Sequence, residues 1–482
     1  MIQGTNSNAG KSLVVAGLCR LFQMHGLRVA PFKPQNMSNN AAAVQGGEIG
    51  RAQALQALAC GIEPTTDMNP ILLKPEGESG SQVIVQGKKY AQVKARDYFK
   101  MKAELLPFVI QSYERLQQQY DIVIVEGAGS PAEVNLRAGD IANMGFAEAV
   151  NLPVVMVADI EQGGVIANLV GCFHVLNQLD RDRIKGYIIN KFRGDISLFD
   201  DGILAINNAT GWADLGVLPF FEKAHLFPAE DSLELSKKYQ NQNQSNDTYN
   251  IAVLRLPRIA NFDDIDPLAQ EDGVSLSIIS HGNPIPVETD LIIIPGSKAT
   301  IFDLEQLKQW GWHHDIYAHI RRGGRILGLC GGYQMLGNII SDPDGIEGKS
   351  KTVSGLSLLD VETVLTNDKT VHPIEGVFEQ EIKLKGYEIH LGVTTGEDCS
   401  RPLFHLEKKP EGAQSMDGKI MGSYLHGLFS SDEFRNYFLE KLTRKAHTPR
   451  QYDATIEQTL TEFAQHLEQF LSFEKIQKIA GL

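Results

Sequence analysis

Short apolar runs rich in β-branched residues recur along the chain, and each is followed by a glycine or polar break and then by helical spacing. Buried parallel strands joined by crossover helices have this pattern, because helices cover both faces of such a sheet. The sequence therefore predicts an α/β fold with doubly wound parallel sheets. The runs are residues 121–125, 152–158 and 185–190 in the first half and 251–256, 291–295 and 325–329 in the second.

The alternation of apolar runs and helical segments is interrupted once, and this interruption divides the chain into two predicted domains. Residues 236–250 are polar and poor in aliphatic side chains, as a solvated linker is. We expect a P-loop domain over residues 1–235 and a second doubly wound domain over residues 251–445. Residues 446–482 have helical spacing, and we expect them to pack on the second domain. A chain of 482 residues is long enough for two such cores.

Charge and cysteine usage argue against several classes of protein. The chain has 45 basic and 59 acidic residues, a net charge of −14, and no long basic run, which argues against nucleic-acid or membrane-surface binding. Its five cysteines are scattered and never form a CxxC pair, which argues against a disulfide framework or a zinc site. The sequence has no basic-then-apolar leader and no run long enough to span a bilayer. We expect a cytoplasmic protein, and the sequence leaves its oligomeric state open.

A glycine-rich segment near the N-terminus has the residues of a phosphate-binding loop. In such loops backbone N–H groups and a helix N-terminus surround phosphate oxygens, a lysine neutralises charge, and a hydroxyl reaches Mg²⁺. Five residues separate the two glycines here instead of the usual four, and only a stub of strand precedes the loop. The alternative is a glycine-rich turn with no ligand. The residues predicted to contact ATP are Gly4, Thr5, Asn6, Gly10, Lys11 and Ser12.

Residues farther along can complete this nucleotide site. Glu126 follows a strand-like run, which places its carboxylate at the carboxyl edge of the sheet, where doubly wound folds bind ligands. Ser12 and Glu126 therefore form a predicted Mg²⁺ site. Lys33 closes another short strand and can bring a second cation to the same edge, although an ordinary surface lysine is the alternative. Asp140 follows a loop segment, where an aspartate is often a helix cap.

The second domain contains a candidate nucleophile. Cys330 is followed by two glycines and lies between a predicted strand and a predicted helix, an arrangement that exposes a thiol on a tight turn and favours its thiolate. His426, in a glycine-bounded turn, is a candidate base for Cys330. The backbone N–H groups of Gly296 and Gly331 are candidate oxyanion donors. A structural thiol, a core histidine and plain turn glycines are the alternatives.

The two groups of residues resemble two kinds of enzyme domain. Cys330 with the distant His426 resembles the glutamine amidotransferase domain of the triad superfamily, and the long phosphate loop with Glu126-Gly-Ala-Gly resembles dethiobiotin synthetase and its relatives. Over nearly its whole length the chain is similar to the cobyric acid synthase family. The blocks that carry this similarity are residues 33–40, 68–75, 126–136, 140–145, 189–195 and 386–390.

The resemblance implies an ATP- and glutamine-dependent ligase of cobalamin biosynthesis that amidates the b, d, e and g carboxylates of adenosylcobyrinic acid a,c-diamide. It implies an acyl phosphate made in the first domain and ammonia released through a thioester on Cys330. It also places Asp140 near the reacting carboxylate and Asn190 against the adenine. The implied substrates are ATP with Mg²⁺, glutamine and a corrinoid polycarboxylate, with no tightly bound organic cofactor.

Besides the short first strand and Glu161-Gln-Gly-Gly after Asp159, one departure from the family pattern concerns the histidine, and three rival interpretations remain. Many amidotransferases of the superfamily have a glutamate two residues after the histidine, where this chain has Leu428, so we expect a Cys330–His426 dyad. The first rival is a cobyrinic acid a,c-diamide synthase, against which residues 33–37 argue. The second is a ParA/MinD-type ATPase switch, which carries a second lysine where this chain has Asn6. The third is a remnant without enzymatic activity.

Overall fold

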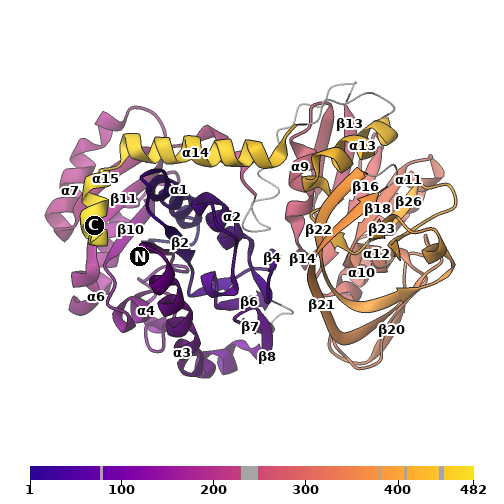
Figure 1. Ribbon diagram of the computed structural model, residues 1–482, viewed down its shortest axis with the longest axis horizontal. Helices are drawn as coiled ribbons and strands as arrows, with labels where there is room; N and C mark the ends of the chain where they lie inside the picture. Colours follow the sequence, from indigo (N-terminus) through magenta and orange to yellow (C-terminus); the bar gives the residue numbers. More distant parts are fainter. Residues whose placement is uncertain (76–79, 229–247, 379–381, 407–409, 444–449) are drawn as a thin grey trace.

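The computed structural model describes residues 1–75, 80–228, 248–378, 382–406, 410–443 and 450–482. Two α/β domains lie side by side, and helix α14 (Tyr452–Phe470) crosses from the second back over the first (Figure 1). The predicted α/β class is confirmed, and each of the six apolar runs contains a strand. Residues 236–247 of the predicted linker lie outside the described residues, and β13 begins at Tyr249. No helix in the described part of the chain has the length and hydropathy needed to cross a bilayer.

The first domain is built on parallel strands in the order β2-β9 and β1-β10-β11-β12. A parallel bridge between Ile2 and Glu126 joins the two groups, so that β9 lies beside β1. The strands are β1 (Ile2–Gly4), β2 (Val29–Phe32), β9 (Ile122–Val125), β10 (Val154–Asp159), β11 (Ile184–Phe192) and β12 (Ala213–Pro219). The helices are α1 (Lys11–Met24), α2 (Arg51–Cys60), α3 (Ala95–Gln119), α4 (Met144–Ala149), α5 (Val165–Val175), α6 (Gln178–Arg183) and α7 (Asp200–Thr210).

Two smaller β-structures extend the first domain toward the second (Figure 1). One is a mixed sheet of order β3-β6-β7-β8, and the other is the hairpin β4-β5, which contacts β21 and β22 of the second domain. Neither was expected from the sequence. Their strands are β3 (Gln35–Met37), β4 (Ala41–Val44), β5 (Gly47–Gly50), β6 (Ile71–Pro75), β7 (Gly80–Val85) and β8 (Lys88–Lys94).

The second domain has a central sheet of order β15-β13-β16-β18-β26-β25, parallel except for β25 at one edge. Its strands are β13 (Tyr249–Leu254), β15 (Val274–Ile279), β16 (Leu291–Ile294), β18 (Arg325–Leu329), β25 (Ala413–Gln414) and β26 (Ile420–Ser423). Its helices are α9 (Asp266–Ala269), α10 (Thr300–Gln309), α11 (Trp312–Arg321), α12 (Gly331–Leu336) and α13 (Asp432–Thr443).

A second sheet of the same domain contains the long strands β21 and β22 and reaches toward the first domain. Its strands are β19 (Ile339–Asp342), β20 (Lys351–Ser354), β21 (Glu362–Phe378), β22 (Ile382–Thr395), β23 (Phe404–Leu406), β24 (Pro410–Glu411) and β27 (Leu425–His426). A separate pair is formed by β14 (Ile259–Ala260) and β17 (Gly296–Ser297). β27 pairs with β22, which brings Tyr387 opposite His426.

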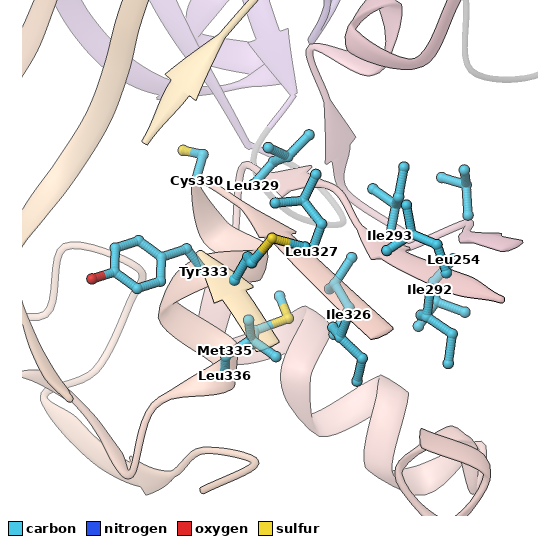
Figure 2. Close-up of a cluster of buried hydrophobic side chains, with 14 of the residues drawn as sticks. Leu254, Ile292, Ile293, Ile326, Leu327, Leu329, Cys330, Tyr333, Met335 and Leu336 are labelled. Carbon is cyan, nitrogen blue, oxygen red and sulfur yellow. The ribbon is translucent and has the colours of Figure 1, made fainter. Parts of the chain in front are cut away.

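The core of the second domain consists of aliphatic side chains from its central strands, packed against α12. β16 is buried along its whole length, as expected of a central parallel strand. Figure 2 shows Cys330 at the edge of this cluster, with its sulfur pointing away from the packed side chains. Cys330 is itself buried and belongs to this cluster, so the core anchors the turn that carries it and the thiol lies at the margin of the packing.

The expectation that the C-terminal segment packs on the second domain is wrong. Helices α14 and α15 (Phe473–Ala480) belong to the core of the first domain, and α14 packs on α1. Gly17 of α1 allows this, because a Cβ there would lie 2.4 Å from Leu467 Cδ1. The apolar side of α14 consists of Tyr452, Ile456, Leu460, Phe463 and Leu467. Helical spacing showed that this side was apolar but did not show which domain it covers.

Candidate active site

The phosphate loop connects β1 to α1, as expected. Gly10 precedes the first residue of α1 with φ +85°, and a Cβ there would lie 2.4 Å from the side-chain nitrogen of Asn190, so glycine fits both the conformation and the space. Lys11 Nζ is buried in the loop and donates to the carbonyl oxygens of Asn6 at 2.8 Å and Gly129 at 3.2 Å. The lysine thus lies inside the concave side of the loop, where a phosphate group is bound in such folds.

Glu126 is the centre of a buried polar group beside the loop. Its Oε1 accepts hydrogen bonds from Ser12 Oγ at 2.8 Å and Lys33 Nζ at 2.7 Å, and its Oε2 accepts one from Gln56 Nε2 at 2.6 Å. The carboxylate is fully buried. The structure therefore brings together Ser12, Lys33 and Glu126, three residues selected from the sequence, and adds Gln56 of α2, which was missed.

Residues after β11 line the other side of the loop. Asn190 Nδ2 donates to the carbonyl oxygen of Ala9 at 2.8 Å. Lys191 Nζ donates to the carbonyl oxygen of Asn8 at 2.7 Å and pairs with Asp159 at 2.8 Å. Lys191 was not selected from the sequence. Lys11, Lys33 and Lys191 face the carboxylates of Glu126 and Asp159, which leaves a small excess of positive charge beside the loop.

Two polar atoms of the loop are buried without a hydrogen-bond partner among the described residues. They are Thr5 Oγ1 and Asn6 Oδ1. Buried polar atoms are nearly always paired, so unpaired ones in a loop of this shape fit contacts to a ligand.

Asp140 has the alternative role considered above, that of a cap. Its carboxylate accepts hydrogen bonds from the backbone N–H groups of Ala142 at 2.8 Å and Gly145 at 2.9 Å, at the start of α4. Asn143, in the same turn, accepts a hydrogen bond from Ala128 N at 3.1 Å, which ties the turn to the loop after Glu126. Asp140 therefore lies in a turn bound to the loop after Glu126, and its visible contacts are structural.

Cys330 occupies the turn between β18 and α12 in a strained conformation. Its φ of +49° and ψ of −108° lie outside the regions that a non-glycine residue usually adopts. The following turn is close-packed, because a Cβ at Gly332 would lie 2.0 Å from the carbonyl oxygen of Ile294. Strain of this kind at a strand-to-helix turn is the feature that exposes a nucleophile in other α/β enzymes. The predicted position of Cys330 is confirmed.

The expectation of a dyad is wrong, because a carboxylate from another part of the chain reaches the histidine. Asp264 Oδ2 lies 2.6 Å from Nδ1 of His426, and Asp264 Oδ1 accepts a hydrogen bond from Gly427 N at 2.6 Å. Both side chains are buried. Asp264 lies on the 3-10 helix η5 (Phe262–Ile265), 162 residues before His426. Asp264 thus supplies a carboxylate on Nδ1 of His426, although the position two residues after the histidine is Leu428.

The surroundings of His426 favour the imidazolium. Burial by itself lowers the pKa of the imidazole, but the charge of Asp264, its hydrogen bond and the nearby Cys330 outweigh burial and raise the pKa to about 10. Nε2 of the same ring is buried, and Cys330 is among the groups beside the ring that raise its pKa. The arrangement thus supplies a positive charge and a proton beside the thiol.

The two candidate oxyanion glycines lie next to this pair. A Cβ on Gly296 would lie 3.2 Å from His426 Cε1 and 3.7 Å from Cys330 Cβ. Gly331 follows Cys330, and a Cβ there would lie 3.0 Å from Ser297 N. Gly296, Gly331, Cys330 and His426, all selected from the sequence, therefore come together at one point.

The pocket at this point is lined by both domains. Its walls include Cys330 and His426 from the second domain and Lys74 of β6 from the first. Burial lowers the pKa of Lys74 to about 8, against the raising effect of Glu48, and Lys298 adds to the lowering. Lys74, which forms an ion pair with Glu48, and Lys298 are the two lysines that line the pocket. Neither lysine was selected from the sequence.

Sequence signals existed for some of the missed residues. Asp263, Asp264 and Asp266 are three acids within four positions between apolar residues, and any of them that is buried there needs a partner. Gln56 and Lys191 had no such signal, because a glutamine within a helix and a lysine after a strand are ordinary surface residues.

Comparison with known proteins agrees with this two-site arrangement. Residues 1–234 match the family described as CobQ/CobB/MinD/ParA nucleotide binding domain, and residues 250–434 match the CobB/CobQ-like glutamine amidotransferase domain. A cobyric acid synthase from Jannaschia sp. (strain CCS1) is 54% identical over 478 residues, which are 99% of this chain and 98% of that protein.

Two further relatives with the same name cover the chain completely. The cobyric acid synthase of Rhodobacter capsulatus is 54% identical over 484 residues, covering 100% of this chain and 99% of its own length. That of Ruegeria sp. (strain TM1040) is 54% identical over 482 residues, covering 100% of this chain and 98% of its own length. Identity at this level over both domains leads to one conclusion: the chain belongs to the cobyric acid synthase family of glutamine amidotransferase ligases.

Proposed function

We propose that the chain converts adenosylcobyrinic acid a,c-diamide to adenosylcobyric acid by amidating its b, d, e and g carboxylates, with ATP as the energy source and glutamine as the nitrogen donor. One observation carries this proposal. A single chain of this family contains both a phosphate loop lined by lysines and a buried Cys330–His426–Asp264 group. Each site supplies one half of an amidation.

In the first domain, a carboxylate of the corrinoid attacks the γ-phosphorus of ATP and forms an acyl phosphate, with ADP as the leaving group. Lys11 and Lys33 stabilise the charge that develops on the transferred group and on ADP. Asn190, packed on Gly10, is proposed to face the adenine, and Asp140 to lie near the reacting groups. The local cationic charge offsets the repulsion between two anionic substrates and a protein of net charge −14.

The donor set beside the loop fits Mg²⁺. Ser12 Oγ and the carboxylate of Glu126 are hard oxygen donors 2.8 Å apart. No cluster of three or more His, Cys, Asp or Glu suited to a metal occurs in the described part of the chain, so the protein would supply few ligands and the phosphates the others, as is usual for this ion. Bound there, Mg²⁺ would neutralise phosphate charge. Lys33 and Gln56 hold the carboxylate of Glu126 in place.

In the second domain, Sγ of Cys330 attacks the side-chain amide carbon of glutamine. The backbone N–H groups of Gly296 and Gly331 donate to the oxyanion, and His426 gives its proton to the departing nitrogen, so that ammonia leaves and a glutamyl thioester remains. Water then hydrolyses the thioester to glutamate. Ammonia attacks the acyl phosphate, phosphate leaves, and the amide is complete.

A substrate experiment tests this proposal. Purified protein receives ATP, Mg²⁺, the a,c-diamide corrinoid and either glutamine or an ammonium salt, and products are followed by mass spectrometry. We expect four successive mass changes of one amidation each. Amidation of cobyrinic acid at the a and c positions instead would support a diamide synthase, and ATP turnover without amide product would support a switch ATPase.

A cysteine pair of variants tests the nucleophile. Cys330→Ser should lose glutamine-dependent amidation and keep ammonium-dependent amidation. Cys399→Ser, in the same domain and half-buried, is the matched control and should keep both. Glutamine use by Cys330→Ser at the parent rate would show that the nucleophile is assigned wrongly.

A further inference from the structure

Arg51, the first residue of helix α2, reaches from the first domain to side chains of the second domain that lie next to His426 and its partner Asp264. It forms an ion pair with Asp263, and its Nη2 donates to the hydroxyl of Tyr387 at 3.0 Å. Its guanidinium also lies 5.6 Å from the centre of the Tyr387 ring. Asp263 and Tyr387 are both buried in the second domain. One arginine thus binds two separate elements of the other domain, η5 and β22.

Both of these partners lie next to His426: Asp263 is adjacent to the carboxylate that binds the imidazole, and Tyr387 stacks on the ring. Asp263 precedes Asp264, the residue that binds Nδ1 of the imidazole. The Tyr387 ring stacks on the imidazole, with 5.4 Å between ring centres and an angle of 22° between the planes. Arg51 therefore contacts the two elements that fix the imidazole, one at its edge and one on its face.

The first domain holds η5 at a second point. The backbone N–H of Ala41, in the hairpin β4-β5, donates to Oδ1 of Asn261 at 3.4 Å, directly before η5. Asn261 has φ +50° and starts this short helix in a left-handed conformation. The segment that carries Asp264 is thus held by contacts from the other domain in addition to its own packing.

The position of Arg51 in its helix points to a role outside that helix. A positive charge in the first turn of a helix is unfavourable, because the backbone dipole already places positive charge there. The guanidinium is compensated by carboxylates of the second domain. Five residues later the same helix carries Gln56, which donates to Glu126 at 2.6 Å and to the carbonyl oxygen of Ser12 at 3.2 Å. One rigid helix therefore touches both sites.

We propose that Arg51 is a positioning residue of the glutaminase site, supplied by the nucleotide-binding domain, which sets the orientation of His426 through Asp263 and Tyr387. The inference rests on the proposed glutaminase role of Cys330 and His426. It makes the glutaminase a shared site: the second domain holds the reacting groups, and the first domain fixes the imidazole among them.

The test uses the full chain with Arg51→Gln, which removes the charge and retains a polar side chain. We expect kcat for glutamine hydrolysis to fall about 10- to 100-fold with a smaller change in KM, because a misplaced imidazole slows the reaction more than it weakens binding. Ammonium-dependent amidation should stay within about twofold. Arg28→Gln, which removes an exposed ion pair with Asp121 in the same domain, is the matched control and should leave both activities unchanged.

A second variant separates positioning from a general structural role. Tyr387→Phe keeps the ring on the imidazole and removes only the hydroxyl that accepts from Arg51. We expect a loss of about three- to tenfold in kcat, and we expect the double variant Arg51→Gln/Tyr387→Phe to lose less than the product of the single losses, because both remove one interaction. An equal loss of ammonium-dependent amidation in Arg51→Gln would overturn the proposal, as would full glutamine activity in that variant.

Cys330→Ser, assayed beside these variants, distinguishes the two levels of inference. If Cys330→Ser keeps glutamine hydrolysis, the proposed glutaminase site itself is wrong. If Cys330→Ser loses glutamine hydrolysis and Arg51→Gln retains parent kcat, the site is correct and the role of Arg51 is refuted.

Discussion

Replacing Asp264 by asparagine tests whether a carboxylate so distant in sequence completes the catalytic group. Asp264→Asn keeps the size of the side chain and removes the charge that holds the imidazolium of His426. The pKa of His426 is about 10, more than three units above its ordinary value of 6.5, and Asp264 is the main cause that raises it against burial. Each unit corresponds to about 1.4 kcal/mol, so the surroundings favour the imidazolium by roughly several kcal/mol.

In Asp264→Asn, burial is the dominant influence on the imidazole, and its pKa should fall to 6.5 or below. At pH 7.5 about a tenth or less of the molecules then carry the proton that the leaving nitrogen needs, where almost all do in the parent. Loss of the fixed ring orientation adds to this, and asparagine in place of a triad aspartate costs about 10⁴-fold in serine proteases. We expect kcat for glutamine hydrolysis to fall at least about 100-fold at pH 7.5.

The assay is glutamate release from pH 6 to pH 10, with ammonium-dependent amidation as the check on the first domain. The parent should keep its rate up to about pH 9, and the variant should lose its remaining rate as pH rises above 6. Asp398→Asn is the matched control, since Asp398 is also buried and accepts a backbone hydrogen bond, from Asp360 at 2.8 Å. If Asp264→Asn shows the parent rate and pH profile, the reasoning about the imidazolium is refuted.

The remaining predictions concern the loop, the imidazolium and the C-terminal helix. Lys11→Ala should abolish ATP-dependent amidation and leave glutamine hydrolysis measurable, as followed by ADP and glutamate release. Gly10→Ala should raise the KM for ATP at least tenfold, because a methyl group there meets Asn190 and φ is +85°. Folding raises the pKa of His426, so the protonated imidazole beside Asp264 stabilises the fold fully below about pH 6.5 and loses this effect as pH rises through about 10. The parent should therefore have a higher free energy of unfolding in urea than Asp264→Asn, and this difference should shrink across that pH range. Leu467→Ala should lower the free energy of unfolding by about 2–5 kcal/mol, whereas Leu204→Ala at an exposed position should change it by less than about 0.5 kcal/mol, as measured by urea unfolding.

Local chemistry was predictable from the sequence where one short segment carries all the information. The strands in the six apolar runs, the phosphate loop and the turn at Cys330 each follow from spacing within about ten residues, and the structure has them where they were expected, whereas β3 to β8 were not expected. Asp264 was missed because it reaches His426 across 162 positions, and no local pattern specifies such a contact. The residue two positions after the histidine, Leu428, therefore does not reveal whether His426 has a carboxylate partner.

The packing of the C-terminal helices was missed for the same physical reason. The apolar side of α14 was readable from its spacing, but several apolar surfaces were available to cover it. What selects the first domain is the fit of Leu467 against Gly17, a contact between residues 450 positions apart. Packing of this kind depends on the assembled surface of both elements, and spacing within either element does not contain it.

The return of α14 to α1 has a consequence for the order in which the protein matures. A ribosome makes the whole amidotransferase portion before it makes residues 452–480, so α1 of the nucleotide-binding domain emerges long before its covering helices. During that interval the apolar face of α1 around Gly17 is open to water or to chaperones. The phosphate loop leads directly into α1, and α1 packs on α14, so C-terminal truncation should damage nucleotide binding before it damages the thiol site.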